Sequence, residues 1–398
     1  MTSFQAFARA DGGKGIRNVV VVAYLVECAH HVARAVTTPF EGRGVNLIGF
    51  GGCYPNGYAQ DMMDALATHP NVGAVLLVSL GCEEFNRQRL KETIARSGRP
   101  VELLVIQRTG GTRATVERGR AWVEQQLLAF KATPRVAMGV DELIVGTICG
   151  GSDGTSGLTA NPAIGKAADL LVDAGAKVMF EELGELFGCE QDMARRAATP
   201  ELGQEILAAM AKSHAAYGTL DQSSFGGGNI SGGLSTIEEK SIGAYTKSGT
   251  RPIVGLLKPG VRPTRAGLYL LDMIGDGPVR FGFPNINDNA EITEMIACGA
   301  HLTLFSTGRG SVVGSAIAPV IKICANPETY RRMTDDMDVD AGRILEGRGT
   351  LDEVGREIVA LVERTAGGEP TKSEALGHQE FVLTYKTFEP LGPACLPA

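Results

Sequence analysis

Short apolar runs alternate with amphipathic segments along most of the chain. The runs are rich in Val, Ile and Leu, and the segments between them repeat their apolar positions with helical period. This alternation is typical of βαβ units whose parallel strands are buried on both faces. We therefore predict an α/β protein with mostly parallel sheets, flanking helices and a ligand site at the carboxyl ends of its strands. The clearest strand candidates are residues 19–26, 45–50, 72–80, 101–107, 142–148, 176–180, 253–257, 302–305 and 320–324.

Capping residues indicate where two helices begin. Asn161 followed by Pro162 suits an N-cap and the first helical position. Thr350 and Glu353 have the spacing of a capping box, in which each side chain bonds to the other residue's backbone N–H. The apolar positions after Thr350 repeat with helical period, so we expect that helix to pack on the core.

A change in composition between residues 131 and 140 indicates a domain boundary. A long helical segment through Trp122 ends there in a connector that contains Pro and Gly. We predict an N-terminal α/β domain over residues 1–138, a candidate for dimerisation, and a Rossmann-like domain over residues 139–398 that carries the site. A second irregular stretch, residues 218–233, is dense in Gly and Ser, and its length favours a segment that covers or forms a site.

The charge and hydropathy of the chain argue against nucleic acid and membrane partners. The 398 residues include 38 basic and 45 acidic ones, a net charge of −7 without a basic stripe, so we expect no nucleic acid partner. Residues 1–18 lack the apolar core of a secretory signal, and no apolar stretch approaches the roughly 18 to 20 residues of a membrane-spanning helix. We therefore expect a cytoplasmic protein whose 8 cysteines are reduced thiols.

Cysteines follow the ends of four predicted strands, at Cys28, Cys53, Cys82 and Cys149. Glycine flanks the last three, which lets a bound group approach the backbone. Because the carboxyl ends of parallel strands meet at one edge of a sheet, we predict that the four thiols converge there on a metal. The alternative is a set of buried thiols that pack as small apolar side chains. We apply that alternative to the remaining cysteines, Cys189, Cys298, Cys324 and Cys395.

A glycine-rich loop follows Cys149 and precedes the helix at Pro162. Such a loop points backbone N–H groups at an anion. It lacks the lysine of a Walker loop and the spacing of a dinucleotide fingerprint, so we predict a site for a carboxylate or phosphate group rather than for a nucleotide. The candidate substrate ligands in and after this loop are Ser152, Asp153, Ser156 and Asn161.

Two further segments contain candidate substrate ligands. Thr307 and Arg309 follow the predicted strand at 302–305, and an arginine between glycines is suited to bind a carboxylate through two hydrogen bonds. A solvated loop arginine is the common alternative. Asn229 lies in the Gly- and Ser-rich stretch, where its amide could hold a hydroxyl group.

Candidate proton-transfer residues lie near the middle of the chain. Lys240, Lys247 and Glu182 are our candidates for acid and base catalysis. Glu182 and Glu185 follow the predicted strand at 176–180, and they could be metal ligands, hydroxyl anchors or surface carboxylates. The 6 histidines show neither the spacing of a metal site nor an H-E-x-x-H motif, so we expect them to be structural.

Five short motifs occur in order along the chain. They are Asp11-Gly12-x-x-Gly15-x-Arg17-Asn18, Leu80-Gly81-Cys82-Glu83, Cys149-Gly150-Gly151-Ser152-Asp153, Thr159-Ala160-Asn161-Pro162 and Thr307-Gly308-Arg309-Gly310. Together with Glu239-Lys240 and the run from Asp336 to Gly342, they resemble the altronate/galactarate dehydratase family over nearly the whole chain. The resemblance implies a lyase that removes water from a sugar acid, leaves a 2-keto-3-deoxy acid and depends on ferrous iron. The family also includes the large subunit of a sulfolactate sulfo-lyase, which releases sulfite from a small hydroxy acid.

The chain departs from the family pattern in three ways. Gly49 stands where family members typically have a histidine shortly before Cys53, and residues 283–289 do not resemble the usual segment. These two differences leave the substrate open. The small β-clip domain of the SAF type that precedes the Asp-Gly motif in altronate dehydratases is not seen before Asp11. We therefore expect a homodimeric core that works with a separate small SAF-type subunit.

The combined hypothesis is a metal-dependent elimination. Cys53, Cys82 and Cys149, with Cys28 as a fourth candidate, would hold Fe²⁺ or an iron–sulfur cluster that binds a hydroxy-acid substrate. One of the lysine and glutamate candidates would take the α-proton. The alternatives are the sulfite-releasing lyase, a dinucleotide-dependent oxidoreductase and a non-catalytic binding subunit.

Overall fold

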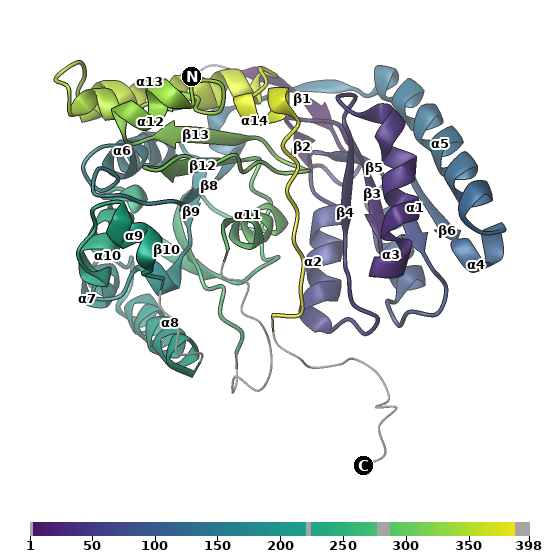
Figure 1. Cartoon of the computed structure of the whole chain (residues 1–398), viewed down its shortest axis with the longest axis horizontal. Coiled ribbons are helices and arrows are strands. Elements are labelled where there is room, and N and C mark those ends of the chain that lie inside the picture. The colour runs from purple at the N-terminus through teal and green to yellow at the C-terminus, as the bar shows by residue number, and fades with distance from the viewer. Residues whose placement is uncertain (1–2, 220–223, 277–286, 387–398) are drawn as a thin grey trace, which may run out of the picture.

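The computed structural model describes residues 3–219, 224–276 and 287–386. Two parallel sheets form two lobes, and helices α2 and α11 lie between them (Figure 1). A small antiparallel sheet is formed by the first strands of the chain and by the segment that connects the lobes. The structure confirms the predicted α/β class with parallel sheets and flanking helices. None of the helices in the described ranges is long and apolar enough to cross a membrane.

The N-terminal lobe contains a four-stranded parallel sheet. Its strands, in spatial order, are β4 (Val45–Gly49), β3 (Val19–Tyr24), β5 (Val72–Ser79) and β6 (Val101–Val105). The helices of this lobe are α1 (Glu27–Thr37), α2 (Gly57–Ala67), α3 (Arg87–Arg96), α4 (Ile106–Thr109) and α5 (Thr112–Ala129).

The C-terminal lobe contains a seven-stranded parallel sheet. Its strands, in spatial order, are β10 (Ile253–Leu257), β11 (Gly267–Leu271), β9 (Lys177–Phe180), β8 (Ile144–Cys149), β12 (Leu302–Thr307), β13 (Val320–Cys324) and β14 (Val339–Asp340). Its helices are α6 (Ala160–Asp173), α7 (Glu190–Arg195), α8 (Pro200–Thr219), α9 (Gly227–Ser231), α10 (Ile237–Tyr245), α11 (Asp288–Ala297), α12 (Pro327–Arg332), α13 (Leu351–Ala366) and α14 (Lys372–Leu376).

All nine predicted strands occur, with their ends shifted by a few residues. The central ones are buried along their whole length, as in β5 and β12, because helices cover both faces of each sheet. The prediction did not include the strands β1 (Phe4–Ala8), β2 (Lys14–Gly15), β7 (Arg135–Met138), β11 and β14. β1 pairs with β7, which lies far along the chain, and such a partner cannot be read from a local pattern.

The larger sheet reverses its chain order beside β8. From β8 the chain passes through α6 to β9 on one side, whereas β12 lies on the other side of β8. α6 packs in the core on one face of the sheet, and α11 packs on the opposite face. In open α/β sheets ligands bind at such a reversal, beyond the carboxyl ends of the strands. The loops after β8 and β12 are therefore the expected walls of a site.

The two lobes share their hydrophobic cores. Phe4 and Ile16, from the start of the chain, pack with Met138 in the core of the C-terminal lobe. Met62 of α2 packs with Met295 of α11 in the core between the lobes. The predicted boundary between residues 138 and 139 stays a prediction, but the contacts show that the two lobes are not independent in their packing.

The ends of the helices bear on three local predictions. Thr350 and Glu353 form the predicted capping box at the start of α13. Asn161 is not an N-cap, because α6 begins one residue earlier, at Ala160. The stretch 218–233 is more regular than predicted, since α8 continues to Thr219 and α9 follows; residues 220–223 lie outside the described ranges.

Two histidines at the junction of the lobes are held in the neutral form. His301 accepts a hydrogen bond from the backbone N–H of Ile144 at Nδ1 (3.0 Å) and contacts the carbonyl of Lys14 through Nε2 (3.0 Å). His69 is fully buried beside it. Burial lowers the pKa of His301 from 6.5 to about 4, and burial together with His301 lowers the pKa of His69 well below its ordinary value.

We expect acid to destabilise the protein through these histidines. Because the folded pKa of His301 lies below the unfolded value, its contribution is complete above pH 6.5 and is lost as the pH falls towards about 4. The loss is on the order of 3 kcal/mol for this group. Urea unfolding between pH 4 and 7 should show this slope, and His301→Gln, which keeps a donor and an acceptor but does not titrate, should flatten it. An unchanged slope in that variant would contradict the assignment.

Candidate active site and metal centre

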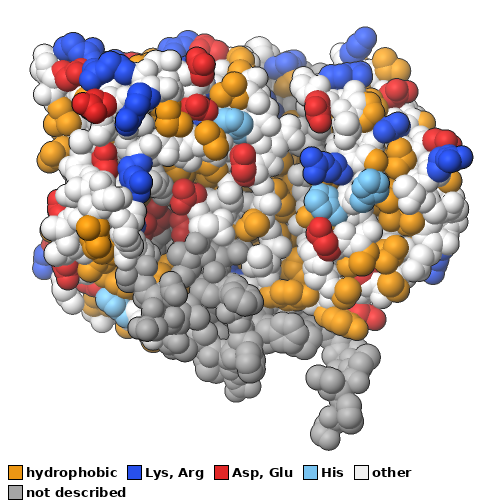
Figure 2. Space-filling model, viewed as in Figure 1, with side chains coloured by type: hydrophobic (Ala, Val, Ile, Leu, Met, Phe, Trp, Pro, Cys, Tyr) orange, Lys and Arg blue, Asp and Glu red, His pale blue; other side chains and the backbone are white. Residues whose placement is uncertain are grey.

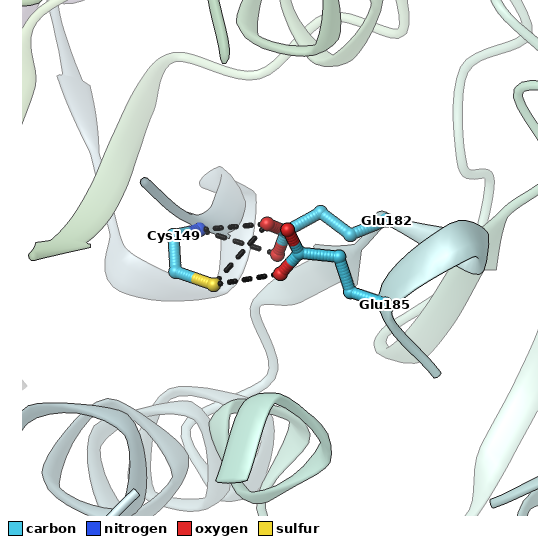
Figure 3. A group of neighbouring side chains, drawn as sticks. All are labelled: Cys149, Glu182 and Glu185. Atoms are coloured by element: carbon cyan, nitrogen blue, oxygen red, sulfur yellow. Dashed lines mark hydrogen bonds between the residues drawn. The ribbon is translucent and has the colours of Figure 1, made fainter. Parts of the chain in front are cut away.

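Three side chains meet at the carboxyl ends of β8 and β9. The Cys149 thiol lies 3.2 Å from Glu182 Oε1 and 3.2 Å from Glu185 Oε2, and the Cys149 backbone N–H donates to the Glu182 carboxylate (3.2 Å). Figure 3 shows both carboxylates pointing toward the cysteine from the segment after β9. The ligand atoms of the three residues all lie within 4.8 Å of one another. This spacing is suitable for a single metal ion.

The backbone places these residues at the reversal in the sheet. Cys149 is the last residue of β8. Glu182 follows β9 in a left-handed conformation (φ 79°), which costs free energy for a side chain that is not glycine, and Glu185 ends the short 3₁₀ helix η4 (Leu183–Glu185) that follows. Strained backbone of this kind concentrates at functional sites, where surrounding contacts hold it in place.

Each glutamate of the cluster is paired with a lysine. Lys247, in the 3₁₀ helix η5 (Thr246–Ser248), forms an ion pair with Glu182, and both side chains are 2% exposed. Lys240 of α10 forms an ion pair with Glu185 at 2.5 Å. The two pairs balance the charges of both carboxylates in a site that is nearly closed to water.

The lysines and burial together set the protonation of the cluster. Burial raises the pKa of Glu182 above its ordinary value, and the positive charge of Lys247 opposes that rise. Burial also opposes ionisation of Glu185, but Lys240, Lys247 and the hydrogen bond from Cys149 together outweigh it and lower the pKa of that carboxyl. The pKa values of Lys240 and Lys247 are raised, because the surrounding acidic groups outweigh the effect of burial. Both lysines are therefore cations, a state that does not suit the predicted role of proton acceptor.

The Cys149 thiol is held in its protonated form. Burial raises its pKa well above the ordinary value, and the neighbouring Glu182 and Glu185 raise it further. A metal ion that bound at Cys149 would therefore have to displace the thiol proton, so its affinity would depend on pH.

Helix α11 contributes a row of acids opposite the cluster. Asp288, Glu291 and Glu294 occur at every third residue, a spacing that places them on one side of the helix. Asp288 lies against the loop after β8, because a Cβ atom on Gly150 would come within 2.0 Å of its Oδ2. Figure 2 shows acidic side chains gathered in a recess of the surface between α10 and α11.

The inner end of this row is closed by a lysine from near the C-terminus. Glu294 Oε1 accepts from the Tyr58 hydroxyl of α2 (2.5 Å) and from the Lys386 ammonium. Glu181, which directly follows β9, is 1% exposed, and neither of its carboxylate oxygens has a hydrogen-bond partner among the described residues. Burial, and then the charges of Glu294 and Glu291, raise the pKa of Glu181 well above its ordinary value.

The glycine-rich loop after β8 lines a cavity beside the cluster. The cavity has a volume of about 240 Å³ and includes the predicted ligands Ser152, Asp153, Ser156 and Asn161 together with Lys240. Ser152 Oγ lies 3.5 Å from the Cys149 sulfur, which joins the cavity wall to the cluster. The structure thus brings four predicted substrate ligands and one predicted catalytic residue to one place.

Two of these predicted ligands have internal bonds that fix the loop. Asp153 accepts from Thr155 and from Asn326, so its carboxylate holds the loop in shape. Asn161 accepts from Ser306 Oγ (2.5 Å) and donates to a backbone carbonyl of α10 (3.1 Å). Both residues shape the cavity through these contacts.

The remaining predicted ligands are not among the residues that line the cavity. Asn229 donates to the Ser152 carbonyl (3.3 Å), and Thr307 accepts from a backbone N–H in its own loop (3.0 Å). Arg309 is exposed and donates to the carbonyl of Gly228 in α9 (2.8 Å). The contact of Arg309 joins the loop after β12 to α9, and the contact of Asn229 joins α9 to the loop after β8.

The other three candidate metal ligands lie in the N-terminal lobe. Cys28 is in the first turn of α1, and Cys53 and Cys82 follow β4 and β5; all three are exposed. The prediction that four thiols share one sheet edge is wrong, because their strands belong to two sheets. Of the cysteines in the described part of the chain, only Cys149 belongs to a group of three or more potential metal ligands at binding distance. A metal role for Cys53 and Cys82 stays a prediction.

The position of Gly49 is also explained by packing in that lobe. A Cβ atom there would come within 2.2 Å of the Tyr24 ring, which in turn stacks on His30 at 4.7 Å between ring centres. The aromatic ring of Tyr24 therefore occupies the space that a larger residue at position 49 would need.

The ligand atoms of the cluster fit a single divalent metal ion better than an iron–sulfur cluster. One thiol and two carboxylates offer the mixed sulfur and oxygen donors that a divalent transition metal accepts, and three protein ligands leave positions open for a substrate. Iron–sulfur clusters are held mainly by cysteine thiolates. The residues at this site therefore fit a single divalent ion and do not fit an iron–sulfur cluster.

Sequence reasoning missed the acids of α11 and the lysine that pairs with them. It placed Glu185 only among several possible roles, whereas the structure puts it in the cluster. The sequence contained one usable signal, which is the regular spacing of Asp288, Glu291 and Glu294 in a segment whose other residues are mostly apolar. Lys386 has no such signal, because its partner lies 92 residues away in the chain.

Comparison with known proteins identifies relatives for both lobes. Residues 140–388 match the family described as "D-galactarate/Altronate dehydratase, C-terminal", and residues 6–131 match "D-galactarate dehydratase/Altronate hydrolase, second domain". The chain is 34% identical to the (2R)-sulfolactate sulfo-lyase subunit beta of Chromohalobacter salexigens, over 96% of this chain and 97% of the relative.

Two dehydratases are related at similar identity. The altronate dehydratase of Bacillus subtilis is 30% identical over 96% of this chain and 77% of its own length. The galactarate dehydratase (L-threo-forming) of Escherichia coli is 34% identical over 76% of this chain and 58% of its own length. With both family descriptions matched and these relatives aligned, the chain belongs to the D-galactarate/altronate dehydratase family and is an enzyme of the lyase class.

Proposed function

We propose that this lyase eliminates water from a sugar acid to leave a 2-keto-3-deoxy acid, with a divalent iron ion held by Cys149, Glu182 and Glu185. The observation that carries the proposal is the convergence of these three donors, within 4.8 Å of one another, at the sheet reversal. A bound divalent ion would supply positive charge for the enediolate that forms when the α-proton leaves.

The surrounding residues suit the other needs of an elimination. Lys240 lines the cavity as a cation, and it can stabilise negative charge or give a proton to the departing hydroxide. Ser152 lines the same cavity, and its hydroxyl is suited to donate to the substrate carboxylate, whereas the backbone N–H groups of residues 153–156 are bonded within the protein. Lys247 keeps Glu182 in place by its buried ion pair.

Release of sulfite is the second candidate, and one observation favours it. The alignment covers 97% of the sulfolactate sulfo-lyase subunit, compared with 77% and 58% of the two dehydratases above. Sulfite would leave by the same β-elimination from a three-carbon hydroxy acid. Because that relative is described as a subunit beta, we also propose a small partner subunit for this chain. A homodimeric core and a cytoplasmic location, where thiols stay reduced, complete the proposal.

A product assay tests the elimination and separates the two leaving groups. The protein is purified without oxygen, supplied with Fe²⁺ and incubated with altronate, galactarate and (2R)-sulfolactate. We expect a 2-keto acid from at least one sugar acid, formed without sulfite. Sulfite from sulfolactate, with no product from the sugar acids, would establish the second candidate. If no 2-keto acid and no sulfite form, with or without a co-purifying small subunit, the proposal is refuted.

A further inference from the structure

The candidate bases around Cys149 are already committed to other partners. Lys240 and Lys247 are cations in ion pairs, and Glu182 and Glu185 each bind a lysine and the Cys149 thiol. A group that takes a proton from the substrate must be basic and must be able to reach the substrate. These four residues do not meet both conditions.

Asp288 differs from them in its contacts. It begins α11, directly after the N-cap Asn287, whose side chain accepts from a backbone N–H of the first turn. Its carboxylate lies against the Gly150 backbone, one residue from Cys149. No ion pair to Asp288 is formed by the residues that the structure describes, and the side chain is partly exposed.

The next acid along the row is less suitable. Glu291 is 7% exposed and lies one helical turn deeper. Glu294 is fully buried and holds Tyr58 and Lys386. Asp288 is therefore the acid of α11 that combines proximity to Cys149 with a partly exposed side chain.

From this geometry we propose that Asp288 is the general base that takes the α-proton of the substrate. The inference rests on the proposed elimination. In that step the α-proton passes to the Asp288 carboxylate, and the electrons of the broken C–H bond form a carbon–carbon double bond. The bond from the β-carbon to its hydroxyl breaks, the hydroxide takes a proton from Lys240, and water leaves. The enol then becomes the 2-keto acid, and no oxidant or reductant is needed.

A structural role is the alternative for Asp288. An acid in the first turn of a helix stabilises the helix through its dipole, by a few tenths to about 1 kcal/mol. Asp352 holds a comparable place in the first turn of α13, where it is exposed and pairs with Lys166. Asp352→Asn is therefore a matched control for a loss of helix stabilisation without a change at the recess.

Substitution and isotope exchange test the assignment. The Fe²⁺-loaded wild type, Asp288→Asn, Asp288→Glu and Asp352→Asn are compared on whichever of altronate, galactarate or (2R)-sulfolactate the wild type converts. We expect Asp288→Asn to lower turnover about 10² to 10⁴-fold. It should lower the exchange of the α-proton with D₂O in parallel, and leave iron content and substrate binding within about twofold. Asp288→Glu should recover part of the exchange, and Asp352→Asn should behave as wild type.

The outcomes separate this inference from the function on which it rests. Wild-type turnover and exchange in Asp288→Asn would overturn the base assignment and leave the elimination standing. A loss of substrate binding equal to the loss of turnover would assign Asp288 to binding instead. A wild type that converts none of the three acids would overturn the proposed function, and the base assignment with it.

Discussion

Cys149→Ser is expected to remove iron from the purified protein and to abolish elimination. Serine keeps the size of the side chain, but its hydroxyl is a far poorer donor than a thiolate for a transition metal, and the two remaining carboxylates are already paired with lysines. We expect iron content to fall at least tenfold, measured by metal analysis after anaerobic purification, and turnover to fall below detection.

The same experiment decides between the structural and the sequence-based metal centre. Cys53→Ser and Cys82→Ser change exposed thiols in the other lobe and should retain iron if Cys149 is the anchor. Cys324→Ser controls for a buried thiol outside the cluster, since Cys324 lies at the end of β13. Loss of iron in the Cys82 variant with retention in the Cys149 variant would reverse our assignment.

Lys247→Met is expected to destabilise the folded protein strongly. Lys247 and Glu182 are each 2% exposed, so the substitution leaves a carboxylate buried without its counter-charge. Breaking a buried pair in this way typically costs about 3 to 5 kcal/mol. The free energy of unfolding, measured in urea, should fall by this amount, and activity should be lost because Glu182 is displaced or protonated.

Two further variants make this expectation specific. Lys166→Met makes the same substitution in an exposed ion pair, that of Lys166 with Asp352. It should lower the free energy of unfolding by no more than about 1 kcal/mol. The double variant Lys247→Met with Glu182→Gln removes both charges and should recover part of the stability. Equal losses of unfolding free energy in Lys247→Met and Lys166→Met would show that the buried pair contributes no more to stability than the exposed one.

Much of the fold could be predicted because its central strands are buried on both faces. Residues 72–80, for example, are apolar except for Ser79, as expected of a parallel strand that is covered by helices on both faces. β1 and β7 escaped prediction because their pairing joins residues more than a hundred positions apart. β11 follows a segment that contains prolines and glycines, residues 259–267, and such a segment resembles a loop.

The site was predicted in part, and the failure has a physical cause. The rule that ligands bind at strand ends indicated Cys149 and the loop that follows it, and the structure places them at the cluster and beside the cavity. It could not tell which strands share a sheet, and so it grouped Cys53 and Cys82 with Cys149. The acids of α11 were missed because Glu291 and Glu294 are buried, a place where unpaired carboxylates are rarely expected.

The pairing of Lys386 with Glu294 also has a consequence for how the protein is made. Glu294 acquires its counter-charge from a residue that the ribosome adds after both sheets are complete. Tyr385 beside it packs on Phe50 in the N-terminal lobe, with ring centres 5.1 Å apart. A nascent chain that lacks these two residues keeps an excess of negative charge at the recess and loses one tie between its lobes. Synthesis of this segment therefore gives Glu294 its counter-charge and adds a contact between the two lobes in the same step.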